Sequence, residues 1–341
     1  MTLYPLLMAP CFRSGEETPW GGSMLRDAFM KDAPEQTGES LEISALPGRE
    51  SLVRNGIHAG KTLNSMIELW GEQLTGKLDG DFPLLLKLID ARETLSVQVH
   101  PDDAYAGANE GGKLGKTEAW VVLNCEPGAR LAYGVNAQGK PLSEIFEAGA
   151  EAVEGALNWV DVRPGDVYYI PSGMVHAIGA CIQLYEIQQS SDVTYRFWDW
   201  GRVGKDGKPR ALHIRQALDV TDPELHMEKL WGATSLCKGG SRTYYISNRY
   251  FELCRLNVSG AMPLSDGRML FLTPTAPCTL RWGDESLELN PFDSVLVPAG
   301  LEGVTLESED CKVLMSSPSD REALRRELGY RAENVAGLAE A

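Results

Sequence analysis

The chain has 341 residues, of which 43% are hydrophobic and 23% are charged, and its formal net charge at pH 7 is −16. This composition predicts a globular protein with one large or two moderate domains. The acidic charge argues against a nucleic-acid partner, because such partners are bound through lysine and arginine contacts to phosphate. No apolar run reaches the roughly 18 residues of a membrane helix, and residues 1–10 lack the pattern of a signal peptide. We therefore expect a cytoplasmic protein without a membrane partner.

The seven cysteines are scattered singly along the chain, without a Cys-x-x-Cys pair, and their number is odd. This pattern favours reduced thiols over a disulfide framework or a cysteine zinc site. We assign no chemistry to these side chains.

The first half of the chain mixes strands with helices. Residues 4–10 and 41–44 predict strands, and apolar residues at helical spacing predict a helix between Lys61 and Gly76. Residues 83–89 are a short apolar run, which predicts a buried strand with a single lysine, Lys87. Strands are expected again from Thr94 onward.

The second half contains more strand signals than helix signals. A helix is expected to interrupt the strands at 141–157, and the run from Thr243 to Ser316 predicts a second all-β unit, because its short strand-like segments alternate with turn residues. Other strands are expected within 161–176, at 184–189 and at 193–198, and other helices near 214–218, at 320–328 and in the alanine-rich end.

Two segments, 163–173 and 290–300, resemble each other at an offset of 127 residues. Both contain a Pro-x-Asp turn, a four-residue apolar strand and a Pro-x-Gly turn in the same register. The position equivalent to His176 is Gly303. We interpret this as a duplicated β unit in which only the first copy binds a metal. The alternative is a chance similarity between two turn–strand–turn segments.

The side chains best suited to chemistry lie between residues 96 and 120. Alternate side chains of a strand share one face, so Gln98 and His100 are expected to point the same way. Glu118 faces the same way as Lys116 if it belongs to the strand that follows it. The carboxylate of Glu118 and the ammonium group of Lys116 could therefore lie close together.

A second motif contains Gly165, Pro171, Gly173 and His176 at the spacing Gly-x5-Pro-x-Gly-x2-His. This spacing resembles the second half of the cupin signature, in which the histidine binds a metal just after a strand. The resemblance implies that His176 is a metal ligand.

The first half of the signature departs from the general cupin pattern. Gln98 replaces the first histidine of His-x-His, and 17 residues separate His100 from Glu118. This departure resembles the type I phosphomannose isomerases, zinc-dependent cupins that interconvert mannose 6-phosphate and fructose 6-phosphate. The resemblance covers much of the chain, including 19–22, 42–45, 95–103, 115–120 and 195–196.

The resemblance implies one Zn²⁺ per chain, with Gln98, His100, Glu118 and His176 as its ligands. A catalytic zinc site keeps a position open for water or substrate. One carboxylate and three neutral ligands leave such a site positive, which would stabilise the enediolate of an aldose–ketose isomerisation. The same ligands also suit other first-row ions, so the identity of the metal stays open.

The resemblance also places Glu186, Asp192 and Arg196 in the active site as catalytic residues. Arg196 is expected to be a fixed cation beside the developing oxyanion. Lys116 is the second candidate for catalysis, because a lysine beside zinc could have its pKa lowered enough to transfer protons. The sequence leaves open which group removes the proton from the substrate.

The substrate phosphate needs a charge and a hydrogen-bond donor. Lys87 and Ser96 occupy matching positions in the resemblance and supply an ammonium and a hydroxyl, and Arg202 is a weaker candidate. The remaining histidines are expected to be structural or surface groups: His58, His213 and His226.

We therefore expect a mainly β protein: a cupin barrel (a double-stranded β-helix or jelly roll) with a helical insert, and a second cupin-like β domain. The expected division is a catalytic zinc-binding domain at 1–235, a metal-free cupin-like domain at 236–316 and a helical tail at 317–341. The expected activity is isomerisation of a hexose 6-phosphate. The alternatives are another cupin sugar-phosphate isomerase and a non-catalytic sugar-phosphate sensor. Whether the chain is a monomer or a homo-oligomer is undecided.

Overall fold

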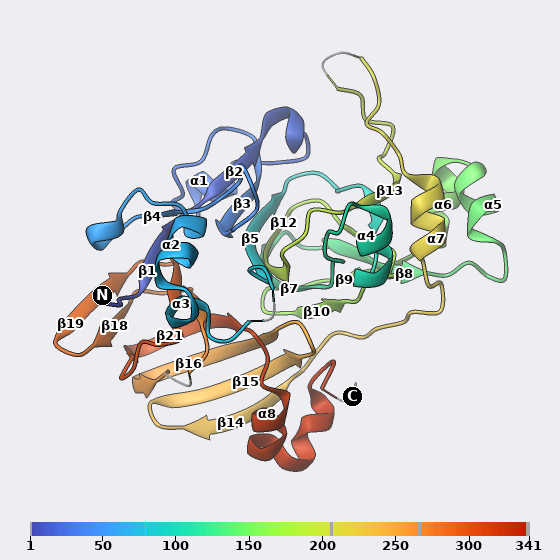
Figure 1. The fold of residues 1–341 in the computed structure, drawn as a ribbon. Helices are drawn as coiled ribbons and strands as arrows, with labels where there is room; N and C mark the ends of the chain where they lie inside the picture. Colours follow the sequence, from blue (N-terminus) through green and yellow to red (C-terminus); the bar gives the residue numbers. More distant parts are fainter. Residues whose placement is uncertain (1, 79, 205–206, 265–266, 339–341) are drawn as a thin grey trace. The chain divides into compact units, whose positions relative to one another are not determined.

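The structure is a computed structural model that describes residues 2–78, 80–204, 207–264 and 267–338 (Figure 1). The chain divides into two compact units. The terminal unit comprises Met1–Cys11, Leu41–Lys87 and Leu230–Ala341, and the central unit comprises Phe12–Ser40 and Leu88–Lys229. The predicted domain boundary at 235 lies close to Leu230, where the last segment of the terminal unit begins. However, Met1–Cys11 and Leu41–Lys87, which were expected in the first domain, belong to the terminal unit as well.

Antiparallel strands form most of the central unit. One sheet has the order β10 (Val167–Ile170), β7 (Glu118–Cys125), β12 (Ile182–Gln189), β5 (Leu84–Ala91), β3 (Thr37–Ile43) and β2 (Cys11–Ser14). Another has the order β13 (Tyr195–Trp198), β6 (Val97–Val99), β11 (His176–Ile178), β8 (Arg130–Val135) and β9 (Leu157–Asp161). Apolar side chains of both sheets, among them Trp120, Leu184, Leu131 and Ile178, pack in one buried cluster.

The sheet that contains β6 is covered on its other face by helices. Val97 and Val99 are fully buried there, in a cluster that includes residues of α6 (Ala150–Ala156) and α7 (Ile214–Val220). Figure 1 shows these two helices next to each other. Because the valines point toward the helices, Gln98 between them must point the other way, toward the first sheet. The predicted alternation along this strand is confirmed.

Most of the expected elements are present, with changes at their ends. The predicted insert at 141–157 forms two helices, α5 (Leu142–Glu147) and α6, separated by Gly149 at φ +93°. The helix expected between Lys61 and Gly76 is also divided, into α2 (Leu63–Trp70) and α3 (Glu72–Thr75), because Gly71 adopts φ +51°. The buried strand expected at 83–89 is confirmed as β5.

The terminal unit is built around a larger antiparallel sheet, to which the run expected to be all-β, 243–316, contributes most of the strands. Its order is β14 (Ala233–Cys237), β15 (Gly240–Ser247), β16 (Glu252–Pro263), β21 (Thr305–Ser317), β17 (Leu270–Pro274), β20 (Ser294–Val297), β1 (Leu6–Ala9) and β4 (Leu52–Val53), with the hairpin β18 (Cys278–Trp282) and β19 (Glu285–Leu289) beside β21.

Short helices complete the chain. The expected helix at 320–328 is confirmed as α8 (Arg321–Leu328), and the following residues form the 3-10 helix η3 (Gly329–Asn334), whereas 339–341 lie outside the described residues. The others are η1 (Gly15–Glu17), α1 (Met24–Asp27), η2 (Gly56–His58) and α4 (Asp103–Asn109). No helix in the described part of the chain is both long enough and apolar enough to cross a membrane.

The internal repeat is present in the structure. The strands β10 and β20 have four residues each and lie at the predicted offset. In both copies the aspartate before the strand accepts a hydrogen bond from the backbone three residues earlier, at 3.0 Å for Asp166 and 2.8 Å for Asp293.

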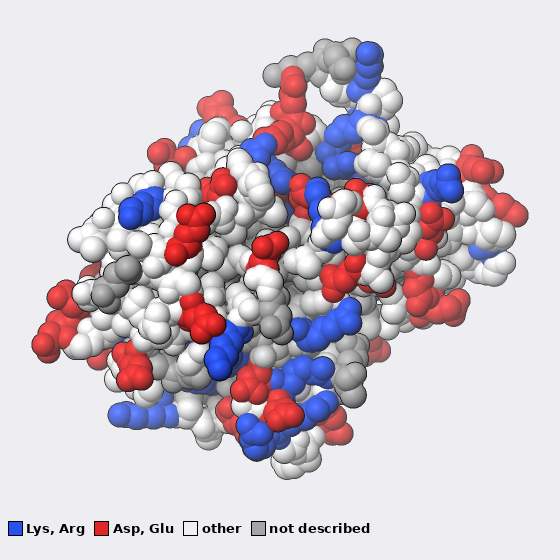
Figure 2. All heavy atoms as spheres, in the orientation of Figure 1, with Lys and Arg blue, Asp and Glu red and all other residues white. Residues whose placement is uncertain are grey.

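Acidic and basic side chains are interspersed on the face seen in Figure 2.

Candidate metal centre

A row of polar side chains crosses the sheet that contains β6. Gln98 on β6 is opposite His176 on β11 and, on its other side, opposite Arg196 on β13. Directly opposed residues of antiparallel strands project to the same face of the sheet. The amide nitrogen of Gln98 lies 3.3 Å from Nε2 of His176. The register thus places three of the predicted site residues side by side.

His100, Glu118 and His176 converge from three different segments. Their potential ligand atoms all lie within 4.8 Å of one another, and each side chain is at most 1% exposed. Glu118 Oε1 is 3.3 Å from His176 Nε2, and Glu118 Oε2 is 3.6 Å from His100 Nε2. Among the described residues this is the only such group of three or more histidine, cysteine or acidic side chains.

Backbone carbonyl groups fix the orientation of both imidazole rings. Nδ1 of His100 is 3.0 Å from the Val193 oxygen, and Nδ1 of His176 is 2.8 Å from the Met174 oxygen. A carbonyl oxygen only accepts hydrogen bonds, so each Nδ1 carries the proton and donates it. Each Nε2 then keeps a lone pair that faces the cluster, which is the state of a histidine that binds a metal.

These residues fit a divalent metal. Glu118 Oε1 is completely buried and accepts no hydrogen bond, which is costly for a carboxylate unless a cation is bound. Two imidazole nitrogens and a carboxylate oxygen are ligands that zinc commonly takes in proteins. Gln98 needs one change to join them, because its amide nitrogen faces His176 while its oxygen accepts a hydrogen bond from Ser96 Oγ at 3.3 Å.

Lys116 is buried beside the same carboxylate. Its Nζ lies 2.6 Å from Glu118 Oε2 and 3.2 Å from His100 Nε2. Burial lowers the pKa of Lys116, but the combined attraction of Glu118 and Glu186 outweighs burial, so the pKa is raised. The protein groups by themselves therefore keep this lysine protonated, the reverse of the lowering expected beside zinc.

The other ionisable groups of the cluster have shifted pKa values. Burial lowers the pKa of His100 to about 3 and also lowers that of His176. Burial raises the pKa of Glu118, but the opposing effects, the largest of which is the charge of Lys116, outweigh burial and bring this pKa well below its ordinary range. At neutral pH both imidazoles are neutral and the carboxylate is charged.

These shifts predict how the stability of the metal-free protein depends on pH. Below about pH 6.5 the unfolded chain protonates its histidines, whereas the folded chain keeps His100 and His176 neutral. The unfolded state then binds more protons. As the pH is lowered, we expect the free energy of unfolding to fall by about 1.4 kcal/mol per pH unit for His100, with a further fall from His176. Urea unfolding at a series of pH values measures this slope. A slope that His176→Gln leaves unchanged would contradict the assignment.

The other predicted residues have different surroundings. Glu186 is 2% exposed and accepts a hydrogen bond from Trp120 Nε1 at 2.9 Å. Asp192 is half-exposed and forms an ion pair with Lys113, 2.8 Å away. Lys87 is buried on β5, at the end of a segment that belongs to the terminal unit.

Arg196 is only partly exposed. Its Nε is buried and has no hydrogen-bond partner. Burial, and next the charge of Arg210, lower the pKa of its guanidinium group. His213, expected to be structural, accepts a hydrogen bond from the backbone nitrogen of Arg196 at 3.3 Å. The position opposite Gln98 and the unused donor leave Arg196 able to bind an anion.

Trp120 was not predicted as a site residue. Its ring lies edge-on to His176, with 5.4 Å between the centroids, and its indole donates to Glu186. It follows Glu118 by two positions on β7, so the alternation of the strand could have indicated that both share a face. Trp120 thus limits the position of both a candidate ligand and a candidate catalytic carboxylate.

Gly115 allows the segment before Glu118 to pack against the segment after His100. An added Cβ would lie 2.5 Å from Asp103 N and 2.8 Å from Pro101 O. We expect Gly115→Ala to lower the free energy of unfolding by about 1–3 kcal/mol through overpacking. Gly107→Ala is the control, because its Cβ would meet open space. Equal unfolding midpoints for the two variants in urea would contradict this prediction.

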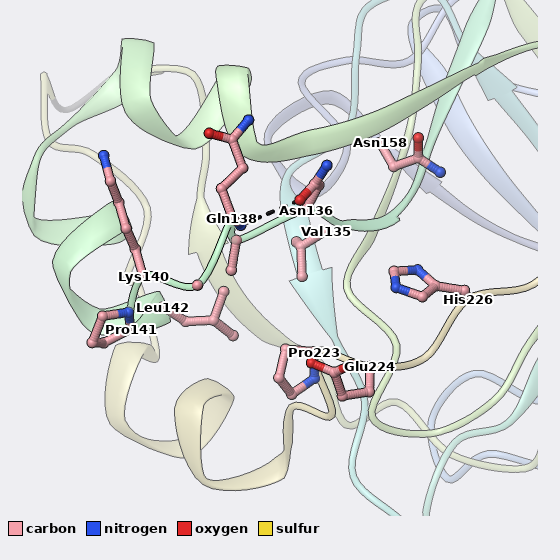
Figure 3. A pocket seen from close by; sticks show the side chains of 12 residues that line it. Val135, Asn136, Gln138, Lys140, Pro141, Leu142, Asn158, Pro223, Glu224 and His226 are labelled. Carbon is pink, nitrogen blue, oxygen red and sulfur yellow. Dashed lines mark hydrogen bonds between the residues drawn. The ribbon is translucent and has the colours of Figure 1, made fainter.

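A surface hollow of about 700 Å³ lies elsewhere in the central unit (Figure 3). It is lined by the turn after β8, in which Gln138 N donates to Asn136 Oδ1 at 3.2 Å, and by Asn158, Glu224 and His226. The lining includes none of the predicted site residues and no cluster of metal ligands. The buried cluster is therefore the stronger candidate for the functional site.

Known proteins with similar sequences identify the family. The family model "Phosphomannose isomerase type I, catalytic domain" matches residues 12–118. Mannose-6-phosphate isomerase ManA of Bacillus subtilis (strain 168) is 38% identical over 317 residues, which cover 90% of this chain and 97% of ManA. Mannose-6-phosphate isomerase of Streptococcus mutans is 37% identical over 308 residues, which cover 86% of this chain and 95% of that protein.

The fold agrees with these sequence matches. The crystal structure of mannose 6-phosphate isomerase from Bacillus subtilis matches with a TM-score of 0.84 and 34% identity, over 92% of this chain and 99% of that chain. The expected fold class, mainly β and cupin, is confirmed. The chain belongs to the type I phosphomannose isomerase family and is an isomerase, as its motifs predicted.

Proposed function

We propose that the protein is a zinc-dependent mannose-6-phosphate isomerase of the cytoplasm that interconverts mannose 6-phosphate and fructose 6-phosphate. The observation that carries the proposal is the convergence of His100, Glu118 and His176 in a buried cluster. Relatives that cover most of the chain are mannose-6-phosphate isomerases. We assign the activity to residues 1–235 and a metal-free role to 236–316.

The proposed ligands of a single Zn²⁺ are His100, Glu118, His176 and Gln98. When bound, the ion supplies positive charge that stabilises the enediolate formed as the sugar loses a proton. The two carbonyl groups that orient the imidazoles keep both Nε2 atoms available. For the Gln98 oxygen to reach the metal its amide must turn, and the amide nitrogen would then donate to Ser96 Oγ, which now donates to the Gln98 oxygen.

The proposed catalytic residues have different roles in the reaction. Arg196 presents a fixed positive charge beside the developing oxyanion. Lys116 holds a proton at Nζ, because its pKa is raised, and would donate it to a substrate oxygen. Glu186 lies buried near it, and Asp192 is the remaining candidate. We propose no identity for the group that removes the proton from carbon.

The substrate phosphate is proposed to bind Lys87 and Ser96, which offer a charge and a hydroxyl. Both side chains are at most 5% exposed. An anion bound by a buried ammonium and a hydroxyl is held more strongly than one at the surface, where water screens the charges.

The decisive experiment incubates the zinc-loaded protein with mannose 6-phosphate and assays the fructose 6-phosphate that forms. We expect turnover that disappears when a chelator removes the metal and returns when zinc is added. Glucose 6-phosphate serves as the control substrate. The proposal fails if no divalent metal supports conversion of mannose 6-phosphate.

A further inference from the structure

The candidate ligands His100 and Glu118 must be brought together by the chain between them. Just before Glu118 this chain returns to the segment that follows His100, where Lys116 N donates to Pro101 O at 2.9 Å. The distance between the two ligands therefore depends on what holds these two segments together.

A side chain from a third segment bridges these two. Gln189, the last residue of β12, is 3% exposed. Its Oε1 accepts from the backbone nitrogen of Thr117 at 2.9 Å, and its Nε2 donates to Asp103 Oδ1 at 2.8 Å. Thr117 lies between Lys116 and Glu118, and Gln189 binds its other side through the backbone, where Gln189 N donates to Thr117 O at 3.1 Å.

The contact needs an amide. Asp103 Oδ1 also accepts from Gly115 N at 2.9 Å, so this oxygen receives a donor from each side. Only a side chain that offers both a donor and an acceptor can join Asp103 to Thr117. A buried polar contact of this kind fixes one arrangement, because every broken hydrogen bond leaves an unsatisfied group.

We propose that Gln189 is a positioning residue of the metal centre, and that its amide sets the position of Glu118 and Lys116 relative to His100. Residues behind the ligands of a metal commonly change its affinity in this way. The inference rests on the proposed metal centre, but it does not depend on the identity of the substrate.

The test is Gln189→Glu, which keeps the acceptor for Thr117 but places a second carboxylate against Asp103. The control is Gln183→Glu on the same strand. Gln183 Nε2 donates to Asp90 Oδ1 at the same distance, 2.8 Å. Its Oε1 accepts from Asn124 Nδ2, which lies near the opposite end of β7 from Glu118. Each variant replaces an amide–carboxylate bond with a pair of carboxylates, and the control pair at Asp90 is the more buried of the two.

Zinc affinity, measured by competition with a chelator, is the main readout. We expect Gln189→Glu to bind zinc about 10- to 100-fold more weakly, and Gln183→Glu to bind it as the wild type does. Hydrogen exchange at the Thr117 amide gives a second readout without metal: it should be faster in Gln189→Met, which removes the acceptor of this amide, and unchanged in Gln183→Glu. If Gln189→Glu does not fold, Gln189→Met replaces it under the same criteria.

Two results would overturn the inference: unchanged zinc affinity in a folded Gln189 variant, or an equal loss of affinity in the Gln183→Glu control. Failure of the proposed function gives a different result. A wild-type protein that binds zinc tightly but does not convert mannose 6-phosphate would end that proposal and leave the role of Gln189 standing.

Discussion

Replacing Arg196 with alanine is expected to lower kcat by about 10²- to 10³-fold, the usual effect of removing one preorganised donor to a developing oxyanion. Arg196 is opposite Gln98 in the sheet, and its buried Nε has no partner in the protein. Its guanidinium group is therefore available to the substrate. The bound zinc should be unchanged, because arginine is not a ligand.

Steady-state kinetics and metal analysis of the same sample test this expectation. Arg130→Ala is the control, since Arg130 lies at an exposed position of β8 in the same sheet. Arg196→Lys should recover little activity, because a point charge does not replace a planar fork of donors. If Arg196→Ala loses its zinc, the role of Arg196 is structural; if it keeps its turnover, the catalytic role is wrong.

Replacing Lys116 with methionine is expected to have opposite effects on binding and on turnover. The ammonium group lies 2.6 Å from Glu118 Oε2, so it competes with a metal for that carboxylate and repels a second cation. Its removal should tighten zinc binding by about tenfold or more, which corresponds to about 1.4 kcal/mol. Turnover should be lost, because no proton donor replaces the lysine.

Competition with a chelator measures the affinity, and thermal unfolding of the metal-free variant gives a second readout. We expect this unfolding at lower temperature, because the charge of Glu118 then stays buried without a partner. Lys312→Met is the control, since Lys312 lies at an exposed position of β21. Weaker zinc binding in Lys116→Met would show that the ammonium group supports the metal site instead of competing with it.

Local sequence patterns predicted much of this site. Alternation along β6 predicted that the side chain of Gln98 points away from those of Val97 and Val99. In the structure both valines are buried under helices. The spacing before His176 predicted a strand that ends near a ligand, and His176 indeed meets Glu118. These predictions succeed because strand periodicity and turn residues act over a few residues.

Features that depend on pairing between strands far apart in the sequence could not be predicted from local patterns. Local periodicity does not contain the register that places Gln98 between His176 and Arg196. Nor does it contain the pairing of Leu6 with Leu296, which brings the first strand into the terminal unit. Gln189 was not singled out, because a glutamine at the end of a strand is ordinary until its partners are known.

A local signal was also missed. The helix α4 begins at Asp103, and Asp102 before it accepts a hydrogen bond from Tyr105 N at 2.8 Å. An aspartate followed by helix-forming residues is a typical N-terminal cap. This helix gives Asp103 its position, and through Asp103 it reaches Gln189.

The most direct test of the metal centre is a zinc titration of the metal-free protein in which bound zinc and turnover of mannose 6-phosphate are measured together. We expect both to rise in parallel and to stop at one zinc per chain. In His176→Gln, which lacks one imidazole, both should fall together. Full turnover before zinc is added, or turnover that does not follow bound zinc, would contradict the assignment of His100, Glu118 and His176 as the catalytic metal centre.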